Sequence, residues 1–173
     1  MQSKDDVSEL FQSVTHGELK TDDVISLIKA FLEDDPSSSY SLVIGTDSHE
    51  KKYSGKGGSS INLVTAILVH RRGYGGKYFW KKKELSNIHS LREKIYAETF
   101  ESLNFALTFV PQLKKKLNGK SPSYNLEIHI DVGEHGDTRD MIKEVVGMVT
   151  GNGFVAKTKP GAYGASSVAD RHT

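Results

Sequence analysis

Two short segments that each run into an aspartate place the strongest constraint on how this chain can fold. Residues 43–49 read VIGTDSH and residues 128–133 read IHIDVG, and both begin with apolar, β-branched side chains. Such runs are typical of buried strands, so Asp47 and Asp131 are expected where strands of a sheet end. An ionised carboxylate beside a sheet core is unfavourable unless a cation pairs with it. The two segments therefore predict a sheet with a carboxylate site at its edge, suited to a divalent metal ion.

The hydrophobic pattern of the whole chain predicts an α/β fold built on a mixed five-stranded sheet. Three strands joined by turns precede two strands joined through helices, which places helices on both faces of the sheet. A helical segment over residues 1–38 is expected ahead of a sheet domain over 39–173. Pro111 is expected to close the longest helix. Strands are expected over 40–47, 61–70, 77–83, 124–131 and 154–159, and helices over 7–14, 22–34, 88–109, 138–150 and 162–171.

Composition excludes several classes of protein and points to one kind of partner. The 173 residues include no cysteine, which excludes disulfides and thiolate–zinc sites. The chain has no apolar run of about 18 residues and no apolar leader, so we expect a cytoplasmic protein. The formal net charge is only +1, yet residues 1–36 hold nine acids and three lysines, a net of −6, whereas residues 51–83 hold nine Lys or Arg and no acid. This asymmetry predicts a basic surface for a phosphate backbone, with a merely solvated surface as the alternative.

The basic segment mixes cations with aromatic rings on a predicted hairpin. Cations contact phosphates and aromatic faces stack on unpaired bases, which favours a nucleic-acid partner. The alternative is an amphipathic strand that packs Phe79 or Trp80 in the core. The predicted nucleic-acid contacts are Arg71, Arg72, Lys77, Trp80, Lys81, Lys82 and Lys83.

Two motifs at opposite ends of the sheet domain resemble a known family. Residues 44–49 read IGTDSH and residues 159–171 read KPGAYGASSVADR. Together they resemble the small bacterial YkuK-type branch of the ribonuclease H-like superfamily, and the resemblance covers roughly residues 40–173. It implies a three-layer fold with acids on the first strand, the first long helix, the fourth strand and the final helix. In this sequence those positions are Asp47, Glu98, Asp131 and Asp170.

The choice of the helix acid rests on spacing, because Glu93, Glu98 and Glu101 all lie in one predicted helix. Glu98 shares a stripe of that helix with Ile95 and Ser102, at intervals of three and four residues. An acid in an inward stripe needs a partner, whereas Glu93 and Glu101 fall further toward the polar side. Spacing therefore favours Glu98 and leaves the other two open.

A four-acid cluster matches the needs of phosphodiester hydrolysis. The reaction needs an activated water and relief of charge on the leaving oxygen, which two metal ions roughly 3.5–4 Å apart supply. Hard ions prefer carboxylate oxygens, so we predict two Mg²⁺ or Mn²⁺ ions at the four acids. The alternative is that Asp131 caps a strand end and that Asp170 is a solvated helix residue.

Histidines gather around the same segments. Asp47 and Asp170 are each followed two residues later by a histidine, and two more flank Asp131. A histidine ligand would favour Mn²⁺ or Zn²⁺, although each histidine taken singly fits better as a polar residue at a strand end or in a loop. The histidines proposed as further metal ligands are His49, His135 and His172.

The sequence thus predicts a metal-dependent nuclease acting on RNA, an RNA–DNA hybrid or structured DNA. Two other classes stay open, because one fold hosts many activities. A nucleic-acid-binding module without turnover would bind through residues 71–83 in a salt-sensitive way and without metal. A metal-dependent phosphatase or nucleotide hydrolase would use the same acids on small substrates and would not need those lysines.

Overall fold

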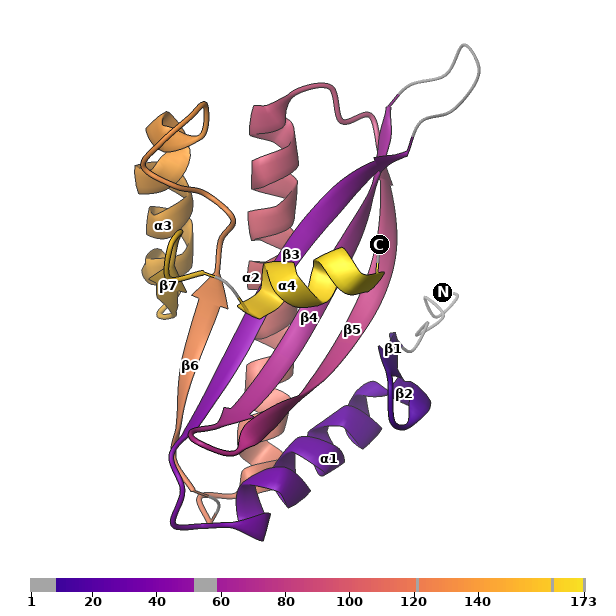
Figure 1. Ribbon diagram of the computed structural model, residues 1–173, viewed down its shortest axis with the longest axis vertical. Helices are drawn as coiled ribbons and strands as arrows, with labels where there is room; N and C mark the ends of the chain where they lie inside the picture. Colours follow the sequence, from indigo (N-terminus) through magenta and orange to yellow (C-terminus); the bar gives the residue numbers. More distant parts are fainter. Residues whose placement is uncertain (1–8, 52–58, 121, 163, 173) are drawn as a thin grey trace, which may run out of the picture.

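Three long antiparallel strands form the centre of the sheet (Figure 1). The computed structural model describes residues 9–51, 59–120, 122–162 and 164–172. In these residues seven strands form one mixed sheet in the order β2-β1-β5-β4-β3-β6-β7. The strands are β1 (Leu10–Ser13), β2 (Gly17–Lys20), β3 (Tyr40–Lys51), β4 (Ser60–Arg71), β5 (Gly75–Ser86), β6 (Tyr124–His129) and β7 (Val155–Lys157). The helices are α1 (Thr21–Asp34), α2 (Leu91–Leu117), α3 (Ile142–Gly151), α4 (Gly164–His172) and a short 3-10 helix (Arg139–Met141).

The pairing of the central strands fixes where the ends of the predicted aspartate segments lie. β3 pairs antiparallel with β4, beginning with Tyr40 opposite Arg71, and β4 pairs in the same way with β5. β6 joins the other side of β3 in parallel, with Gly45 opposite His129, and β7 then pairs in parallel with β6. The mixed sheet flanked by helices confirms the predicted α/β class. It also ends β6 opposite Gly45 of β3, whereas β3 continues to Lys51 and so extends beyond the strand end predicted at residue 47.

The sheet has seven strands where five were predicted, because an N-terminal hairpin replaces an expected helix. β1 and β2 occupy residues 10–20, whereas a helix was predicted over 7–14, of which residues 7 and 8 lie outside the described residues. Phe11 is fully buried while Leu10 and Val14 are exposed, so the segment buries side chains with the alternation of a strand. Gly17, with a φ of 70°, makes the turn between the two strands. The division of the chain at residue 38 stays a prediction.

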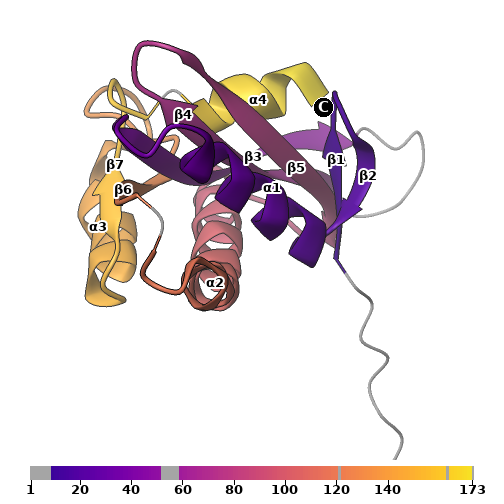
Figure 2. The ribbon, with the colours of Figure 1, turned by 90° about the horizontal axis from the view of Figure 1, so that it is seen from below.

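The helices cover the sheet in layers (Figure 2). α2 and α3 lie on one face, and α4 lies on the opposite face. The larger core joins the sheet to α1, α2 and α3, and it includes Ile28 of α1 and Phe109 of α2. The smaller core joins Val64 and Trp80 of the sheet to Val168 of α4. Because side chains alternate along a strand, neighbouring residues of β3 enter different layers.

The helix α2 runs through Pro111, which corrects the prediction that this proline closes it. Leu113 and Leu117 are buried, so the last turns gain core contacts that offset the hydrogen bond lost at the proline. The helix ends at Asn118, which has a φ of 51° and donates its backbone N–H to the Lys114 carbonyl.

No helix in the described ranges is both long and apolar enough to cross a membrane.

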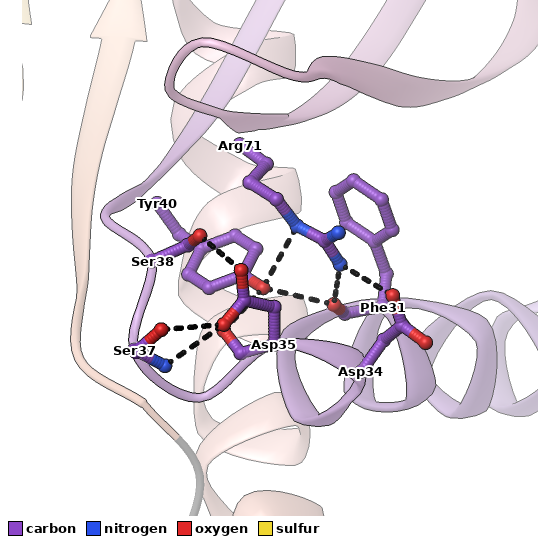
Figure 3. A network of polar contacts seen from close by, with 7 residues as sticks. All are labelled: Phe31, Asp34, Asp35, Ser37, Ser38, Tyr40 and Arg71. Atoms are coloured by element: carbon purple, nitrogen blue, oxygen red, sulfur yellow. Dashed lines mark hydrogen bonds and ion pairs between the residues drawn. The ribbon is translucent and has the colours of Figure 1, made fainter.

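Arg71 ties the end of β4 to the end of α1 (Figure 3). Its guanidinium donates to the Tyr40 hydroxyl, the Phe31 carbonyl and the Asp34 carboxylate, each at 3.0 Å. The same group lies 4.6 Å above the centre of the Phe31 ring. Only 5% of the Arg71 side chain is exposed. Its donors are therefore used inside the fold, which corrects the prediction that Arg71 contacts nucleic acid.

Candidate metal centre

The end of β3 presents successive side chains to two layers of the fold. Ser102 of α2 donates to Thr46 at 2.8 Å, and Ser48 donates to Glu98 of α2 at 2.5 Å. Asp47 lies between these two residues and projects to the opposite face, toward α4. Asp47 is buried, and the backbone N–H of Ser48 donates to its Oδ1 at 2.8 Å. Strand alternation thus sends the Asp47 carboxylate and the Ser48 hydroxyl to opposite sides of β3, and the Glu98 carboxyl group bonded to that hydroxyl is near enough to Asp47 for their charges to interact.

One group of side chains among the described residues has the dimensions of a cation site. A carboxylate oxygen of Asp47, a ring nitrogen of His49 and a carboxylate oxygen of Asp170 all lie within 4.8 Å of one another, and these three residues form the close group. Within this group, His49 Nε2 is 3.7 Å from Asp170 Oδ1. The first two residues share a face of β3, and the third comes from α4, which packs against β3. Ligands about 2.0–2.6 Å from one ion lie at such separations, so the group fits a single divalent ion.

Asp131 follows the end of β6 and lies beside Asp47, which is inside β3 because that strand continues to Lys51. β6 pairs with β3 with Gly45 opposite His129, and the same register two residues later sets Asp131 beside Asp47. The carboxylate of Asp131 forms an ion pair with Lys159, whose Nζ is 2.6 Å from Asp131 Oδ1. Asp131 therefore belongs to this neighbourhood but already has a cationic partner.

Glu98 is the most buried of the four predicted acids, with 6% of the residue exposed. Burial raises its pKa to about 8, against the opposing effect of the Ser48 hydrogen bond, and the Asp47 and Asp131 carboxylates raise it further. Glu98 thus holds a proton at neutral pH in the metal-free protein. A cation bound beside it would favour the ionised form and lower that pKa.

The electrostatics of Asp47 and Lys159 show that the acids share one neighbourhood. Burial raises the pKa of Asp47, and the carboxylates of Asp131 and Asp170 raise it further, against the Ser48 hydrogen bond. The hydrogen bond to Asp131 raises the pKa of Lys159, and Asp47 and Asp170 act in the same direction. Four carboxylates from β3, α2, the segment after β6, and α4 therefore converge. Their roles as metal ligands and catalytic groups stay predictions.

The two acids that helix spacing left open have other partners. The Glu93 carboxylate accepts a hydrogen bond of 2.8 Å from the backbone N–H of His89, which lies just before α2. Glu101 pairs with Lys81 at 3.3 Å and with Lys83 at 3.0 Å. Glu98 is the one of the three whose carboxylate is bonded to β3 beside the close group. The geometry therefore favours the same choice as the spacing.

The other candidate histidines do not join the close group. His172 stacks on Trp80 with ring centroids 3.6 Å apart, and its Nε2 is 3.3 Å from the Tyr78 hydroxyl. This contact fixes α4 to β5 instead of adding a ligand. His135 is exposed in the loop that follows Asp131 and lies outside the group found among the described residues.

Two predicted nucleic-acid contacts of β5 are buried. Lys81 forms ion pairs with Glu9 at 2.7 Å and with Glu101 at 3.3 Å, and 8% of its side chain is exposed. Trp80 is covered by the ring of His172. Neither side chain is available for a phosphate or a base, which corrects the prediction for both residues.

The exposed cations of the predicted surface divide between two faces of the sheet. Lys82 lies opposite Val64, and Val64 lies opposite Asp47, so Lys82 and Asp47 occupy one row across three strands. By strand alternation, Lys77 and Lys83 project to the face that bears α2. Lys82 is thus the contact that shares a face with the close group. The predicted contacts that are exposed are Arg72, Lys77, Lys82 and Lys83.

Lys159 belongs to this site but was not predicted as a site residue from the sequence. Its backbone N–H donates to the Val132 carbonyl at 2.8 Å, and its ammonium reaches Asp131. A signal was present, because a strand-end aspartate requires a cation and the C-terminal motif begins with a lysine. Because Asp131 and Lys159 lie in segments far apart in the sequence, their pairing could not be predicted from it.

Comparisons with known proteins agree with the fold and the motifs. A family model described as Ribonuclease H-like matches residues 23–173. An uncharacterised protein, YkuK of Bacillus subtilis (strain 168), is 37% identical over 174 residues, which cover 96% of this chain and 98% of the relative. No solved structure gave a significant match. Because the family model matches most of the chain and the relative is 37% identical over 96% of it, this chain belongs to the ribonuclease H-like family, as its two motifs predicted.

Proposed function

We propose that this protein is a metal-dependent nuclease that hydrolyses phosphodiester bonds in RNA, an RNA–DNA hybrid or structured DNA. The observation that carries the proposal is the close group of Asp47, His49 and Asp170, with Glu98 and Asp131 beside it. Carboxylates held together against their mutual repulsion, with raised pKa values at the buried ones, are typical of functional sites. Membership of the ribonuclease H-like family supports a function related to nucleic acid.

The donor set fits hard divalent cations. Carboxylate oxygens suit Mg²⁺ and Mn²⁺, and an imidazole nitrogen shifts the preference toward Mn²⁺. Asp47, His49 and Asp170 would hold one ion, and Asp47 with Glu98 and Asp131 would hold a second. Two such ions, when bound, supply an activated water and stabilise the charge on the leaving oxygen.

The protein's own residues prepare the site for that chemistry. Ser48 orients Asp47 and Glu98, because its backbone N–H donates a hydrogen bond to Asp47 and its hydroxyl donates one to Glu98. The carboxyl group of Glu98 holds a proton near neutral pH and gives it up when positive charge enters. Lys82 lies exposed on the same face, where its ammonium would contact the phosphate backbone of a substrate.

The test is cleavage of labelled single-stranded RNA, an RNA–DNA hybrid and a DNA four-way junction during titration with Mn²⁺ or Mg²⁺. Asp47→Asn removes the carboxylate shared by both predicted ion positions, so we expect a loss of at least about 100-fold in cleavage rate. Asp22→Asn, at an exposed acid of α1, is the matched control and should cleave normally. Full metal-dependent cleavage by the Asp47 variant would exclude the mechanism.

The ion pair between Lys159 and Asp131 favours a second candidate, a nucleic-acid-binding module without turnover. In such a module an internal cation takes the place of a metal ion at one acid. It would bind RNA equally well in EDTA and with Asp131→Asn, and no substrate would be cut. Release of phosphate from small phosphate esters, unaffected by Lys82→Ala, would instead indicate a phosphatase or a nucleotide hydrolase.

A further inference from the structure

Lys159 contacts the segment around Asp131 through its backbone, its stem and its ammonium. Its backbone N–H is bonded to the Val132 carbonyl at 2.8 Å, which anchors the start of the side chain beside Asp131. Its stem passes Gly133, where an added Cβ would lie 3.4 Å from Lys159 Cβ and 3.9 Å from Cδ. Its ammonium ends 2.6 Å from Asp131 Oδ1. The segment that carries the aspartate therefore also supports the lysine that neutralises it.

The two predicted ion positions differ in whether Lys159 already contacts one of their carboxylates. The close group of Asp47, His49 and Asp170 comes within 4.8 Å without any contribution from Asp131. The second position needs Asp131, and an ion there would lie close to the ammonium of Lys159, which already contacts Oδ1 of that carboxylate. Two cations held at one carboxylate repel each other, and this repulsion grows as the distance between them falls. The lysine is 56% exposed at its side chain, so it is free to swing into solvent.

We propose that Lys159 is an internal counter-cation that competes with the second divalent ion for Asp131. This inference rests on the proposed metal site and adds an order of occupancy to it. The first ion binds at Asp47, His49 and Asp170 without disturbing Lys159. The second ion binds only when the ammonium leaves Asp131, so its affinity is lower by the strength of that ion pair.

Titration with Mn²⁺ alone, followed by isothermal calorimetry and by the electron paramagnetic resonance of free Mn²⁺, tests the inference without any substrate. In the wild-type protein we expect one tight ion and one weaker ion. Lys159→Met should tighten the weaker ion about five-fold and leave the tighter one within about two-fold. Lys159→Arg keeps the charge and should not tighten it. Lys157→Met removes an exposed lysine two residues earlier and is the matched control.

A measurement in EDTA tests the ion pair independently of metal. Lys159→Met should lower the midpoint of thermal unfolding in the wild-type background but not in the Asp131→Asn background, because the pair is already lost there. Additive effects of the two changes would overturn the inference.

The outcomes separate this inference from the proposed function. If the wild type binds two Mn²⁺ ions and Lys159→Met binds them with the same or lower affinity, the competition is wrong and the metal site stands. If neither protein binds Mn²⁺, the proposed metal site fails and the inference fails with it. A five-fold gain seen with Lys159→Met, but not with the two control variants, supports the competition.

Discussion

Glu98 and Asp170 are carboxylates of one candidate site that meet opposite environments. Glu98 is 6% exposed as a residue, whereas the Asp170 side chain is 66% exposed. Burial disfavours the ionised form of Glu98 and raises its pKa to about 8. The buried acid therefore carries the electrostatic penalty of the metal-free site.

That penalty should appear in the pH dependence of stability. In EDTA, Glu98 ionises near its ordinary pKa of 4.5 in the unfolded chain but keeps its proton to about pH 8 when folded. The unfolded state is therefore favoured progressively between these values, so the free energy of unfolding should fall as pH rises through that window. Glu98→Gln should remove this contribution and be more stable than the wild type at pH 8, with little difference at pH 4.

Urea denaturation at a series of pH values measures the effect. Glu18→Gln, at an exposed acid of β2, controls for the loss of one negative charge. An unchanged pH profile in the Glu98 variant would contradict the assignment of a strongly raised pKa to this residue.

The helix α4 depends on its packing, because a helix of nine residues has little stability alone. Val168 enters the smaller core beside Val64, and His172 stacks flat on Trp80 of β5. Asp170 lies between these two contacts along the helix. The position of this ligand is therefore set by the anchoring of α4 on the sheet.

Loss of the anchor should weaken cation binding without removing a ligand. We expect His172→Ala to lower the affinity for the first Mn²⁺ ion by about 2- to 10-fold, which corresponds to the worth of one aromatic contact. His172→Phe keeps the stacking and should bind like the wild type. Calorimetry gives the comparison, and equal affinities for the Ala and Phe variants would show that the stack does not position Asp170.

For the molecule as a whole, one face of the sheet carries the larger core and the other carries the candidate site. The face bearing α1, α2 and α3 holds the larger core (Figure 2). The face bearing α4 exposes the candidate site and Lys82, which lies in one row with Asp47. Lys77 lies on the other side, with its ammonium 5.7 Å from the centre of the Phe31 ring. A nucleic acid that reaches the acids should therefore contact Lys82 and not Lys77.

The two lysines form a matched pair for testing this orientation. Lys82→Ala should weaken binding of single-stranded RNA and reduce the slope of log affinity against log salt by about one contact. Lys77→Ala removes the same charge from the same strand and should have a smaller effect. Fluorescence anisotropy over a range of salt concentrations measures both. Equal losses would indicate general attraction by the basic strand and not a defined path across the α4 face.

Much of the fold and of the candidate site was predictable from strand patterns. Asp47 and Asp131 come together because the two β-branched runs pair in parallel, with Gly45 opposite His129, so each aspartate follows its paired residue by two positions. Glu98 could be preferred over Glu93 and Glu101 because the 3.6-residue period of a helix distinguishes an acid that faces inward from one that faces outward. These inferences work because they depend on local periodicity, which one sequence displays.

The remainder depends on tertiary partners that local patterns do not reveal. Arg71 and Lys81 look like surface cations, yet each is buried against acids or carbonyls that come from distant segments. The hairpin of β1 and β2 was missed because four-residue strands give too short a pattern to separate from a helix turn. Lys159 reaches Asp131 only because β7 lies beside β6.

The pairing of β1 with β5 has a consequence for how copies of the protein behave toward each other. Among the described residues the register joins the two strands at one position, Gln12 opposite Trp80, so along much of β5 those residues provide no strand partner on that side. Unpaired margins of this kind invite strands of other chains to add on, and lysines are a common deterrent. The charges at Lys77, Lys82 and Lys83 would then also discourage aggregation, whichever of them contacts a substrate.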